Sequence, residues 1–460
     1  MVTIYLDMQV FSHLFKAKEE KYIRLREKIL SHKDEFIFFY SNGHLLDLQK
    51  DYTNKKYAEM EFIQSIVDGN RMVYENSKLE VIKQSLHDAF ETIGKIEDFS
   101  WFENIDFSQL TKEQINVINN IVDISDKDLK GELKFDWLTK RIPISADCVQ
   151  VDKQVFTSLL KNVSYNFYEN KESYKITRDN IVARYNPTSI TAKNEDVFNE
   201  QFSSSPLGLS FLSLVIAVLT QTGVSSTDSA LIYQISYTLL DLFGIKKEAR
   251  KKVNFRNMQI DCIHSLFGSY CDCIVSEDEG MRLKSMTLYK LYNIGTKVYS
   301  IDEFIEKFDE AINNNKKTAR EYFDEVNKDF QTMHVLNTET TPEYTTTTLS
   351  TSYKHFGYFN CMLVRKTKDE TAIILHKNND LNQPILIKEI KIIVNRLAKV
   401  FNDIGANFAL FDEVQEIPQI TSNNWTRILI LNDADLYLTK FKDIPMLCLW
   451  IKLKHSLLQK

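Results

Sequence analysis

Four aspartates lie at positions where they could act together as ligands of a metal ion. They are Asp7, Asp47, Asp261 and Asp278. Each follows an apolar run that is typical of a buried strand, or lies in a helix next to such a run. Open α/β sheets place their ligands at the carboxyl ends of the strands, so we expect the four carboxylates to converge on one edge.

Such a group of carboxylates predicts a hard divalent cation. Unpaired carboxylates repel one another and are tolerated in a cleft when a cation neutralises them. Mg²⁺ and Mn²⁺ prefer oxygen ligands, keep several waters and are usually completed by substrate phosphates. A metal-bound water can then attack a phosphodiester. The residues therefore predict Mg²⁺ or Mn²⁺ and phosphodiester hydrolysis.

The elements that must position Asp7 and Asp47 alternate between strand and helix. The first seven residues form an alternating apolar run that ends on Asp7 and predicts a short buried strand. A charged amphipathic helix is expected over about 18–32, and the aromatic run 36–40 is too short for a helix and predicts a second strand. Asp47 lies one turn into the helix that follows. This order of elements implies a parallel α/β sheet.

The same alternation returns near residue 250. A helix is predicted over 257–270, with Asp261 at its opening, and Asp278 lies just beyond the strand that follows. The further elements are a strand at 273–276, a helix at 281–292, a strand at 297–301 and a helix at 302–314. Between the two halves, from about 57 to 250, the periodicity is mainly helical. One α/β sheet is therefore expected to be split by a long helical insertion.

Three segments resemble the PIN-domain nucleases. They are TIYLDMQVFS at Thr3–Ser12, FFYSNGHLLDL at Phe38–Leu48 and DCIHSLFGSYCDCIVSEDEG at Asp261–Gly280. The family pattern has an Asp ending the first strand and an acid in the helix after the second strand. Later come an Asp starting a helix and a T/S-x-D motif after the next strand. The resemblance covers residues 1 to about 60 and 250 to about 305, and it implies a PIN-like α/β fold.

The resemblance assigns the active-site acids to Asp7, Asp47, Asp261 and Asp278. It adds Asp272, just before the third strand, as a further metal ligand, and Ser276 as the residue that orients the acids. Whether Asp47 or Asp51, and Asp272 or Asp278, complete the metal site stays open. The family's activity implies Mg²⁺- or Mn²⁺-dependent hydrolysis of nucleic acid, usually RNA, that leaves a 5′-phosphate and a 3′-hydroxyl.

The chain divides into four regions on this interpretation. They are a PIN-like domain in two halves (1–60 and 250–330), a helical insertion (61–249), a linker (331–352) and a smaller α+β C-terminal domain (353–460). The linker is polar and rich in threonine, although its threonines could also join an edge strand. In the last region we expect a hairpin at 360–365 and 371–376, a long helix from about Pro384 to Ile404, and strands at 408–411, 428–431 and 447–453.

Each site residue also has a purely structural interpretation. Asp7 and Asp261 could be helix N-caps, and Asp278 could be a turn residue. His44 and His264 share helix faces with Asp47 and Asp261, so each could contact a phosphate, shuttle a proton, or be a hydrogen-bonded, partly buried histidine. Three basic residues near the acids could guide a phosphate backbone; they are Arg256, Arg282 and Lys284.

Composition narrows the class of protein. The chain has 460 residues and a net charge of −6, which argues against binding of DNA by bulk positive charge but allows a local basic patch. The start of the sequence lacks the features of a signal peptide, and the six scattered cysteines suggest a reduced, cytoplasmic protein. The uncharged stretch 207–224 is expected to be a buried core helix rather than a membrane span.

These observations predict a cytoplasmic, metal-dependent nuclease that acts on nucleic acid, with RNA favoured. A toxin or antiviral-defence effector fits the resemblance. The C-terminal domain is expected to regulate activity or to bind a protein regulator, no membrane partner is expected, and a homo-oligomer stays open. The alternative is a catalytically inactive PIN-like scaffold that binds nucleic acid or a protein partner.

Overall fold

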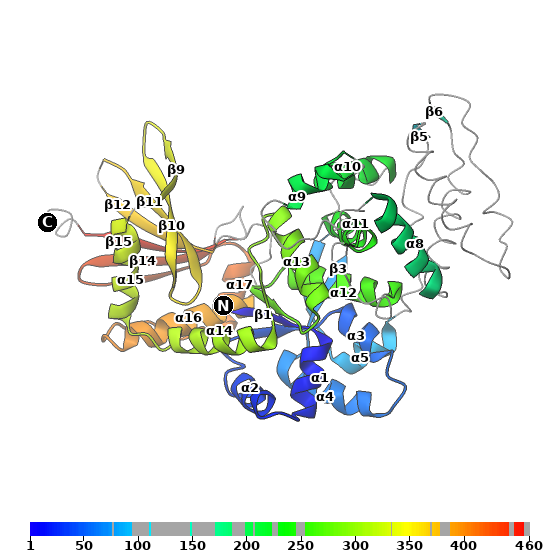
Figure 1. Cartoon of the computed structure of the whole chain (residues 1–460). Helices are drawn as coiled ribbons and strands as arrows, with labels where there is room; N and C mark the ends of the chain where they lie inside the picture. Colours follow the sequence, from blue (N-terminus) through cyan, green and yellow to red (C-terminus); the bar gives the residue numbers. More distant parts are fainter. Residues whose placement is uncertain are drawn as a thin grey trace, which may run out of the picture.

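Two β-sheets organise the chain, one parallel and one antiparallel (Figure 1). The structure is a computed structural model with a mixed α/β architecture. It describes residues 1–75, 78–93, 110–111, 148–149, 171–185, 198–205, 208–222, 229–244, 254–332, 334–368, 370–377, 387–440 and 446–454. The statements below concern these residues.

The parallel sheet has four strands, drawn from the two ends of the predicted split domain. In spatial order they are β2 (Ile37–Phe39), β1 (Thr3–Leu6), β7 (Cys273–Val275) and β8 (Lys297–Tyr299). Leu6 of β1 lies beside Val275 of β7, although about 270 residues separate them. The sequence prediction of these four strands and of their parallel arrangement is confirmed.

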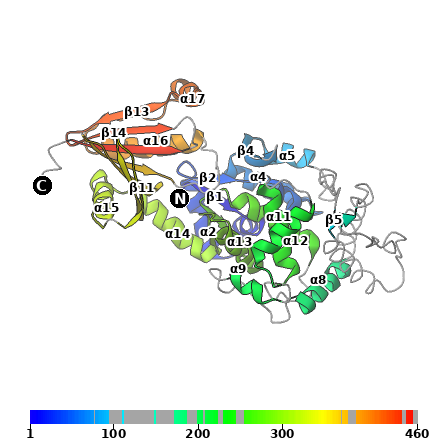
Figure 2. The same ribbon diagram turned by 90° about the horizontal axis from the view of Figure 1, so that it is seen from above.

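Successive residues of β1 face opposite layers of helices, as strand geometry requires. Ile4 and Leu6 belong to one apolar cluster, and Tyr5 belongs to the other. The first layer contains α1 (Met8–Lys16), α2 (Glu20–Ser31), α3 (Asn42–Leu48), α4 (Lys55–Val67), α5 (Leu86–Thr92) and α14 (Ile301–Asn314). The second contains α11 (Ser229–Leu242), α12 (Phe255–Gly268) and α13 (Glu279–Leu291) (Figure 2).

The predicted helical insertion also contains strands. After α4, β3 (Asn70–Glu75) and β4 (Lys78–Lys83) form an antiparallel hairpin, and Arg71 bridges to Tyr40 beside β2. Two short strands, β5 (Leu110–Thr111) and β6 (Cys148–Val149), also pair. Besides α5 and most of α4, its described α-helices are α8 (Lys171–Tyr185), α9 (Phe198–Gln201), α10 (Phe211–Thr222) and α11. No described helix has the length and apolar character needed to cross a membrane.

The C-terminal region is mostly an antiparallel sheet, and it begins earlier than predicted. Its seven strands are, in order, β13 (Thr426–Ile430), β14 (Ala434–Lys440), β15 (Leu447–Leu453), β12 (Thr371–His376), β11 (Phe359–Lys366), β10 (Thr345–His355) and β9 (Val335–Thr340). The sheet packs with α15 (Ala319–Thr332), α16 (Ile387–Asn402) and α17 (Glu413–Thr421).

Three predictions in this region have clear outcomes. The hairpin of β11 and β12 is confirmed. Of the two alternatives for 331–352, the linker is wrong and the edge strand is confirmed, because the polar threonines pair as strands β9 and β10 at one edge of the sheet. The predicted strand at 408–411 is also wrong: this segment is not a strand and leads into α17, whereas β14 was not predicted.

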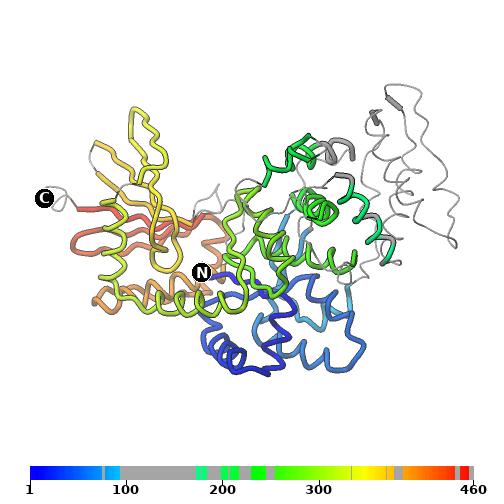
Figure 3. Tube along the Cα trace, in the orientation of Figure 1, coloured from blue at the N-terminus to red at the C-terminus, as the bar shows by residue number. Residues whose placement is uncertain are grey.

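The N-terminus lies where the C-terminal region meets the rest of the chain (Figure 3). The Met1 amino group donates a hydrogen bond to the Gly357 carbonyl, at 3.2 Å. One continuous apolar cluster contains Tyr5 of β1, Tyr237 of α11 and Met362 of β11. The insertion, the parallel sheet and the C-terminal sheet therefore share a core.

Candidate active site

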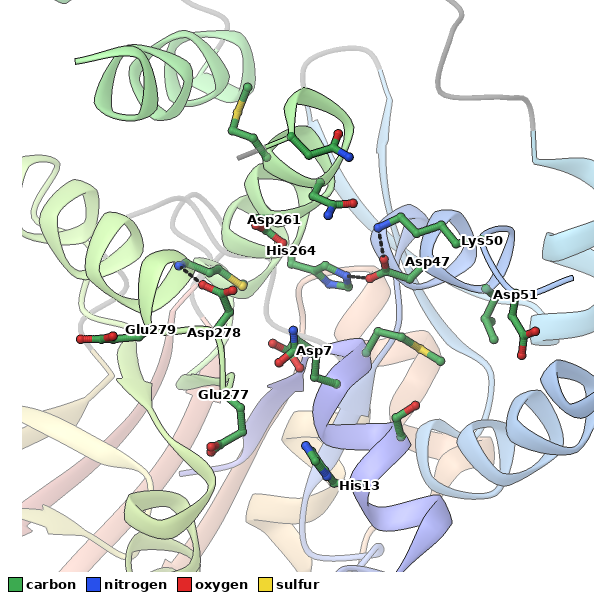
Figure 4. A pocket seen from close by; sticks show the side chains of 18 of the residues that line it. Asp7, His13, Asp47, Lys50, Asp51, Asp261, His264, Glu277, Asp278 and Glu279 are labelled. Carbon is green, nitrogen blue, oxygen red and sulfur yellow. Dashed lines mark hydrogen bonds and ion pairs between the residues drawn. The ribbon is translucent and has the colours of Figure 1, made fainter. Parts of the chain in front are cut away.

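A pocket of about 1300 Å³ opens where β1 and β7 end (Figure 4). All four predicted acids line it, and they come from four different elements. In Figure 4, Asp7 lies centrally, with Asp278 on one side, Asp47 on the other, and Asp261 and His264 nearby. The expectation that the four aspartates gather at one edge of the sheet therefore agrees with the geometry.

Asp7 is both the N-cap of α1 and a wall of the pocket. Its Oδ1 accepts a hydrogen bond from the Val10 backbone N–H, at 3.0 Å, and only 4% of the residue is exposed. Burial raises the pKa of Asp7 to about 6, although the nearby His264 and a hydrogen bond from Ser276 act in the opposite direction. A buried carboxyl with this pKa has a strong preference for a positive partner.

Ser276 joins Asp7 to Asp278. The Ser276 side chain hydrogen-bonds to the Asp7 carboxylate, and its Oγ accepts the Asp278 backbone N–H, at 3.0 Å. Asp278 is the N-cap of α13, and its Oδ1 accepts the Met281 N–H at 2.8 Å. Because Ser276 and Asp278 follow β7 directly, the pairing of β7 with β1 brings these groups to Asp7.

Asp261 lies in the middle of α12, whereas the sequence prediction placed it at the start of a helix. The N-cap of α12 is Asn254, so the N-cap interpretation of Asp261 is wrong. Its carboxylate makes no hydrogen bond within the described residues. Burial raises its pKa well above the usual value, and the negative charges of Asp278 and Asp47 add to this effect, whereas Lys284 opposes it.

Both oxygens of Asp47 already have partners. Oδ2 accepts from His264 Nε2 at 3.0 Å, and Oδ1 accepts from Lys50 Nζ at 2.7 Å. Burial favours the protonated form, but the interactions with His264 and Lys50 outweigh it and lower the pKa of Asp47 to about 2. Asp51, the alternative to Asp47, lines the pocket farther from Asp7, and its Oδ1 accepts the Thr53 N–H at 2.7 Å.

A hydrogen-bonded chain that the sequence did not reveal supports Asp47. The Tyr5 hydroxyl lies 2.9 Å from His264 Nδ1 and 2.6 Å from Ser41 Oγ. Since a carboxylate only accepts, His264 Nε2 carries the proton that points to Asp47. The chain joins β1, the start of α3 and α12. Tyr5 is part of an ordinary alternating strand, so no local signal marked it.

His44 has the structural role that the sequence left open. Its Nε2 donates to the Leu6 carbonyl at 2.7 Å, and its Nδ1 accepts the Ser41 N–H at 3.1 Å. The residue is fully buried, and burial together with the nearby His264 lowers its pKa to about 3. His44 is therefore a neutral residue of the core and does not line the pocket.

Asp272, the fifth predicted acid, lies at the opposite end of β7. Its Oδ2 accepts the Val2 N–H at 2.5 Å, and its Oδ1 lies 3.2 Å from Lys377 Nζ and 3.4 Å from Lys354 Nζ. Burial opposes ionisation, but the two lysines outweigh it and hold its pKa well below the usual value. The direction of the strand is the signal that separates Asp272 from Asp278, because ligands gather at carboxyl ends.

The predicted basic residues differ in position. Arg282 donates from Nη1 to the Ser276 carbonyl at 2.7 Å, and neither Arg282 nor Arg256 lines the pocket. Lys284 does line it, with Nζ 2.6 Å from Asp241 Oδ1 of α11. The sequence also has a run of basic residues before α12 that lies outside the described residues: Lys246, Lys247, Arg250, Lys251 and Lys252. Further basic groups that the sequence reasoning did not select line the pocket: His13, Lys16, Lys18, Lys50 and Lys175.

The acids suit a hard cation by chemistry, although their side chains do not form a finished ligand set. Asp7, Asp261 and Asp278 offer carboxylate oxygens as metal ligands. One of the two Asp278 oxygens already accepts a hydrogen bond from the Met281 N–H. In the described part of the chain, no three His, Cys, Asp or Glu side chains stand close enough together to hold a metal ion. Cys271 and Cys273, before and at the start of β7, are free and buried.

The fold and the site define a mixed α/β protein with an acid-lined pocket at the carboxyl edge of a parallel sheet. Comparisons with protein-family models, with curated proteins and with solved structures found no match.

Proposed function

We propose that the chain is a metal-dependent nuclease that hydrolyses phosphodiester bonds, with RNA as the favoured substrate. One observation carries the proposal: Asp7, Asp47, Asp261 and Asp278 come from distant parts of the sequence and line one pocket at the carboxyl edge of the parallel sheet. The raised pKa values of Asp7 and Asp261 support it, because a bound cation would favour ionisation of both carboxylates.

The residues have distinct roles in this proposal. Asp7, Asp261 and Asp278 would hold Mg²⁺ or Mn²⁺, Asp47 would complete the cluster, and the ion would supply a water of lowered pKa. Ser276 orients Asp7 and Asp278 through the two hydrogen bonds described above. Lysines at the rim, including Lys16 and Lys18, offer charges for phosphates.

The size of the pocket is consistent with a large substrate. Its volume of about 1300 Å³ exceeds the range of roughly 300–1,000 Å³ that is common for small-molecule sites. Exposed charges of both signs line it, among them Lys16, Lys18, Glu19 and Glu277, so we expect a ligand that is large and that binds a cation held by the acids. A strand of nucleic acid meets both requirements.

The test is cleavage of end-labelled single-stranded RNA and DNA by the full chain, with Mn²⁺ or with EDTA. Asp7→Asn and Asp261→Asn are compared with Asp51→Asn, a carboxylate of the same pocket that lies farther from Asp7. We expect cleavage that needs Mn²⁺ and is reduced at least about 10²-fold by either of the first two changes. Cleavage that persists in EDTA, or that ignores both changes, would reject the proposal.

A second candidate is a PIN-like scaffold that binds nucleic acid or a protein without cleaving it. Two observations favour it: the described acids form no finished ligand set, and both oxygens of Asp47 are occupied. A scaffold would bind RNA equally well with Mn²⁺ or EDTA, and Asp261→Asn would leave that binding unchanged.

A further inference from the structure

Lys50 places a positive charge beside the acids of the pocket. Its Nζ lies 2.7 Å from Asp47 Oδ1, and its charge also favours the ionised form of Asp261. Its side chain is one-third exposed, at 33%, so it can leave Asp47 without breaking the core. Lys50 follows the end of α3 and lines the pocket together with both acids.

Asp47 is held rigidly on its other side. His264 is 3% exposed in its side chain, and its Nε2 donates to Asp47 Oδ2, while Tyr5 fixes its Nδ1. A Cβ on Gly43 would lie 2.9 Å from the His264 ring, so α3 packs directly against the imidazole. Of the two partners of Asp47, the buried histidine is therefore fixed, whereas the partly exposed lysine can move once its ion pair is broken.

We propose that Lys50 changes partners during the reaction cycle: it neutralises Asp47 in the metal-free protein and binds a substrate phosphate once a metal ion takes its place beside Asp47. The inference rests on the proposed nuclease function and extends it, because it assigns Lys50 as a phosphate-binding residue that metal binding releases. No covalent step is involved; one ion pair is exchanged for another.

The first measurement is the affinity for Mn²⁺ by calorimetry, without substrate. Lys50→Gln removes the competitor, so its Kd for Mn²⁺ should fall about three- to tenfold relative to the original chain. Lys16→Gln is the matched control, because Lys16 is exposed, lines the same pocket and has the same charge. Lys50→Arg keeps the charge and should bind Mn²⁺ as the original chain does.

The second measurement is the salt dependence of binding to a cleavage-resistant phosphorothioate single-stranded RNA. Each lysine–phosphate contact contributes about 0.7 to the slope of log K against log salt. With Mn²⁺, Lys50→Gln should reduce the magnitude of this slope by about 0.7. In EDTA it should leave the slope unchanged, since Lys50 of the original chain is then paired with Asp47 and does not contact phosphate. Lys16→Gln should change the slope equally in both conditions.

The outcomes separate the two proposals. If the original chain binds Mn²⁺ and Lys50→Gln matches Lys16→Gln in both measurements, the exchange is rejected and the nuclease proposal stands. A loss of slope in EDTA as well as in Mn²⁺ also rejects the exchange, because Lys50 would then contact phosphate without release. If neither the original chain nor Lys50→Gln binds Mn²⁺, both proposals fail. Binding by Lys50→Gln alone would support the exchange in its strongest form.

Discussion

Asp7 experiences two opposing requirements. As the N-cap of α1 it accepts a hydrogen bond, a role for which Asp and Asn are about equally good. As a buried carboxylate near other acids, it is unfavourable when ionised, and its pKa is raised to about 6. At neutral pH a metal-free protein therefore carries a charge at Asp7 that weakens the fold.

The change Asp7→Asn should stabilise the metal-free protein at pH 7.5. The folded state keeps the Asp7 proton up to about pH 6 and the unfolded state loses it near 4, so stability falls as the pH rises between these values. Asn cannot ionise, so its gain in the free energy of unfolding is at most about 3 kcal/mol at pH 7.5 and disappears near pH 4.

Urea unfolding in EDTA at both pH values measures this gain. The same variant should lose the stabilisation that Mn²⁺ gives to the original chain. A variant that is less stable than the original chain at pH 7.5 in EDTA would show that Asp7 has no such charge penalty.

At the scale of elements, α3 and α12 approach each other so closely that only glycine fits between them. Gly43 lies in α3, where alanine would ordinarily be the better helix former by about 1 kcal/mol. A Cβ at this position would lie 2.9 Å from His264 ring atoms, and that ring is fixed by Tyr5 and Asp47. Packing and helix propensity therefore act in opposite directions.

Gly43→Ala should lower the free energy of unfolding by about 1–2 kcal/mol, because overpacking exceeds the gain in helix propensity. Cleavage should fall as well, since Asp47 loses its alignment with His264. Glu61→Ala, an exposed change in α4, controls for substitution in general. A more stable Gly43→Ala variant would mean that α3 and α12 separate easily.

The strand β7 carries different roles at its two ends. Asp272, before the strand, pairs with lysines of the C-terminal region, and Asp278, after it, lies in the pocket. Asp272→Asn should lower the free energy of unfolding by about 1.5–3 kcal/mol, because Lys377 loses one of its two buried carboxylate partners and keeps Glu389 at 3.1 Å. Its affinity for Mn²⁺ should stay unchanged.

Asp278→Asn should give the converse result. Asn still caps α13, so stability should change by less than about 1 kcal/mol, whereas Mn²⁺ binding should be lost. Calorimetry and urea unfolding on both variants provide the comparison. Equal losses of Mn²⁺ binding in the two variants would contradict the assignment of a structural role to Asp272 and a metal-binding role to Asp278.

Sequence patterns predicted the elements whose signals are local. The strands at 3–6 and 273–275 are short apolar runs followed by an acid, and both acids reach the pocket. The strands β9 and β10 appeared only as the alternative to a linker, because β9 is exposed, β10 is mostly half-buried, and both are polar and lack an apolar alternation. The contact of Tyr5 with His264 spans 259 residues and depends on the assembled fold, so no local pattern reveals it.

At the scale of the whole molecule, the regions of the chain are packed as one unit. Tyr237 of the insertion, Tyr5 of the parallel sheet and Leu397 of α16 belong to the same apolar cluster. The ion pairs of Asp272 with Lys377 and Lys354 add a polar connection between the two sheets. Separation of the insertion or of the C-terminal region from the parallel sheet would expose this apolar cluster to water.

The full chain should therefore unfold in a single transition in urea. Fluorescence of tryptophan, which includes the buried Trp425 of the C-terminal region, should change together with the helical signal in circular dichroism. Coincident midpoints are expected for a shared core. An earlier midpoint for either probe would show that the regions unfold independently.

The pairing of β1 with β7 has a consequence for the time course of synthesis. Residues 273–275 leave the ribosome roughly 15–55 s after residues 3–6, at rates of about 5–20 residues per second. During this interval Ile4, Tyr5 and Leu6 lack β7, the strand with which they pair, and Asp7 has no Ser276 beside it. A growing chain therefore lacks the assembled acidic pocket, and the proposed hydrolysis would begin only after most of the polypeptide has been made.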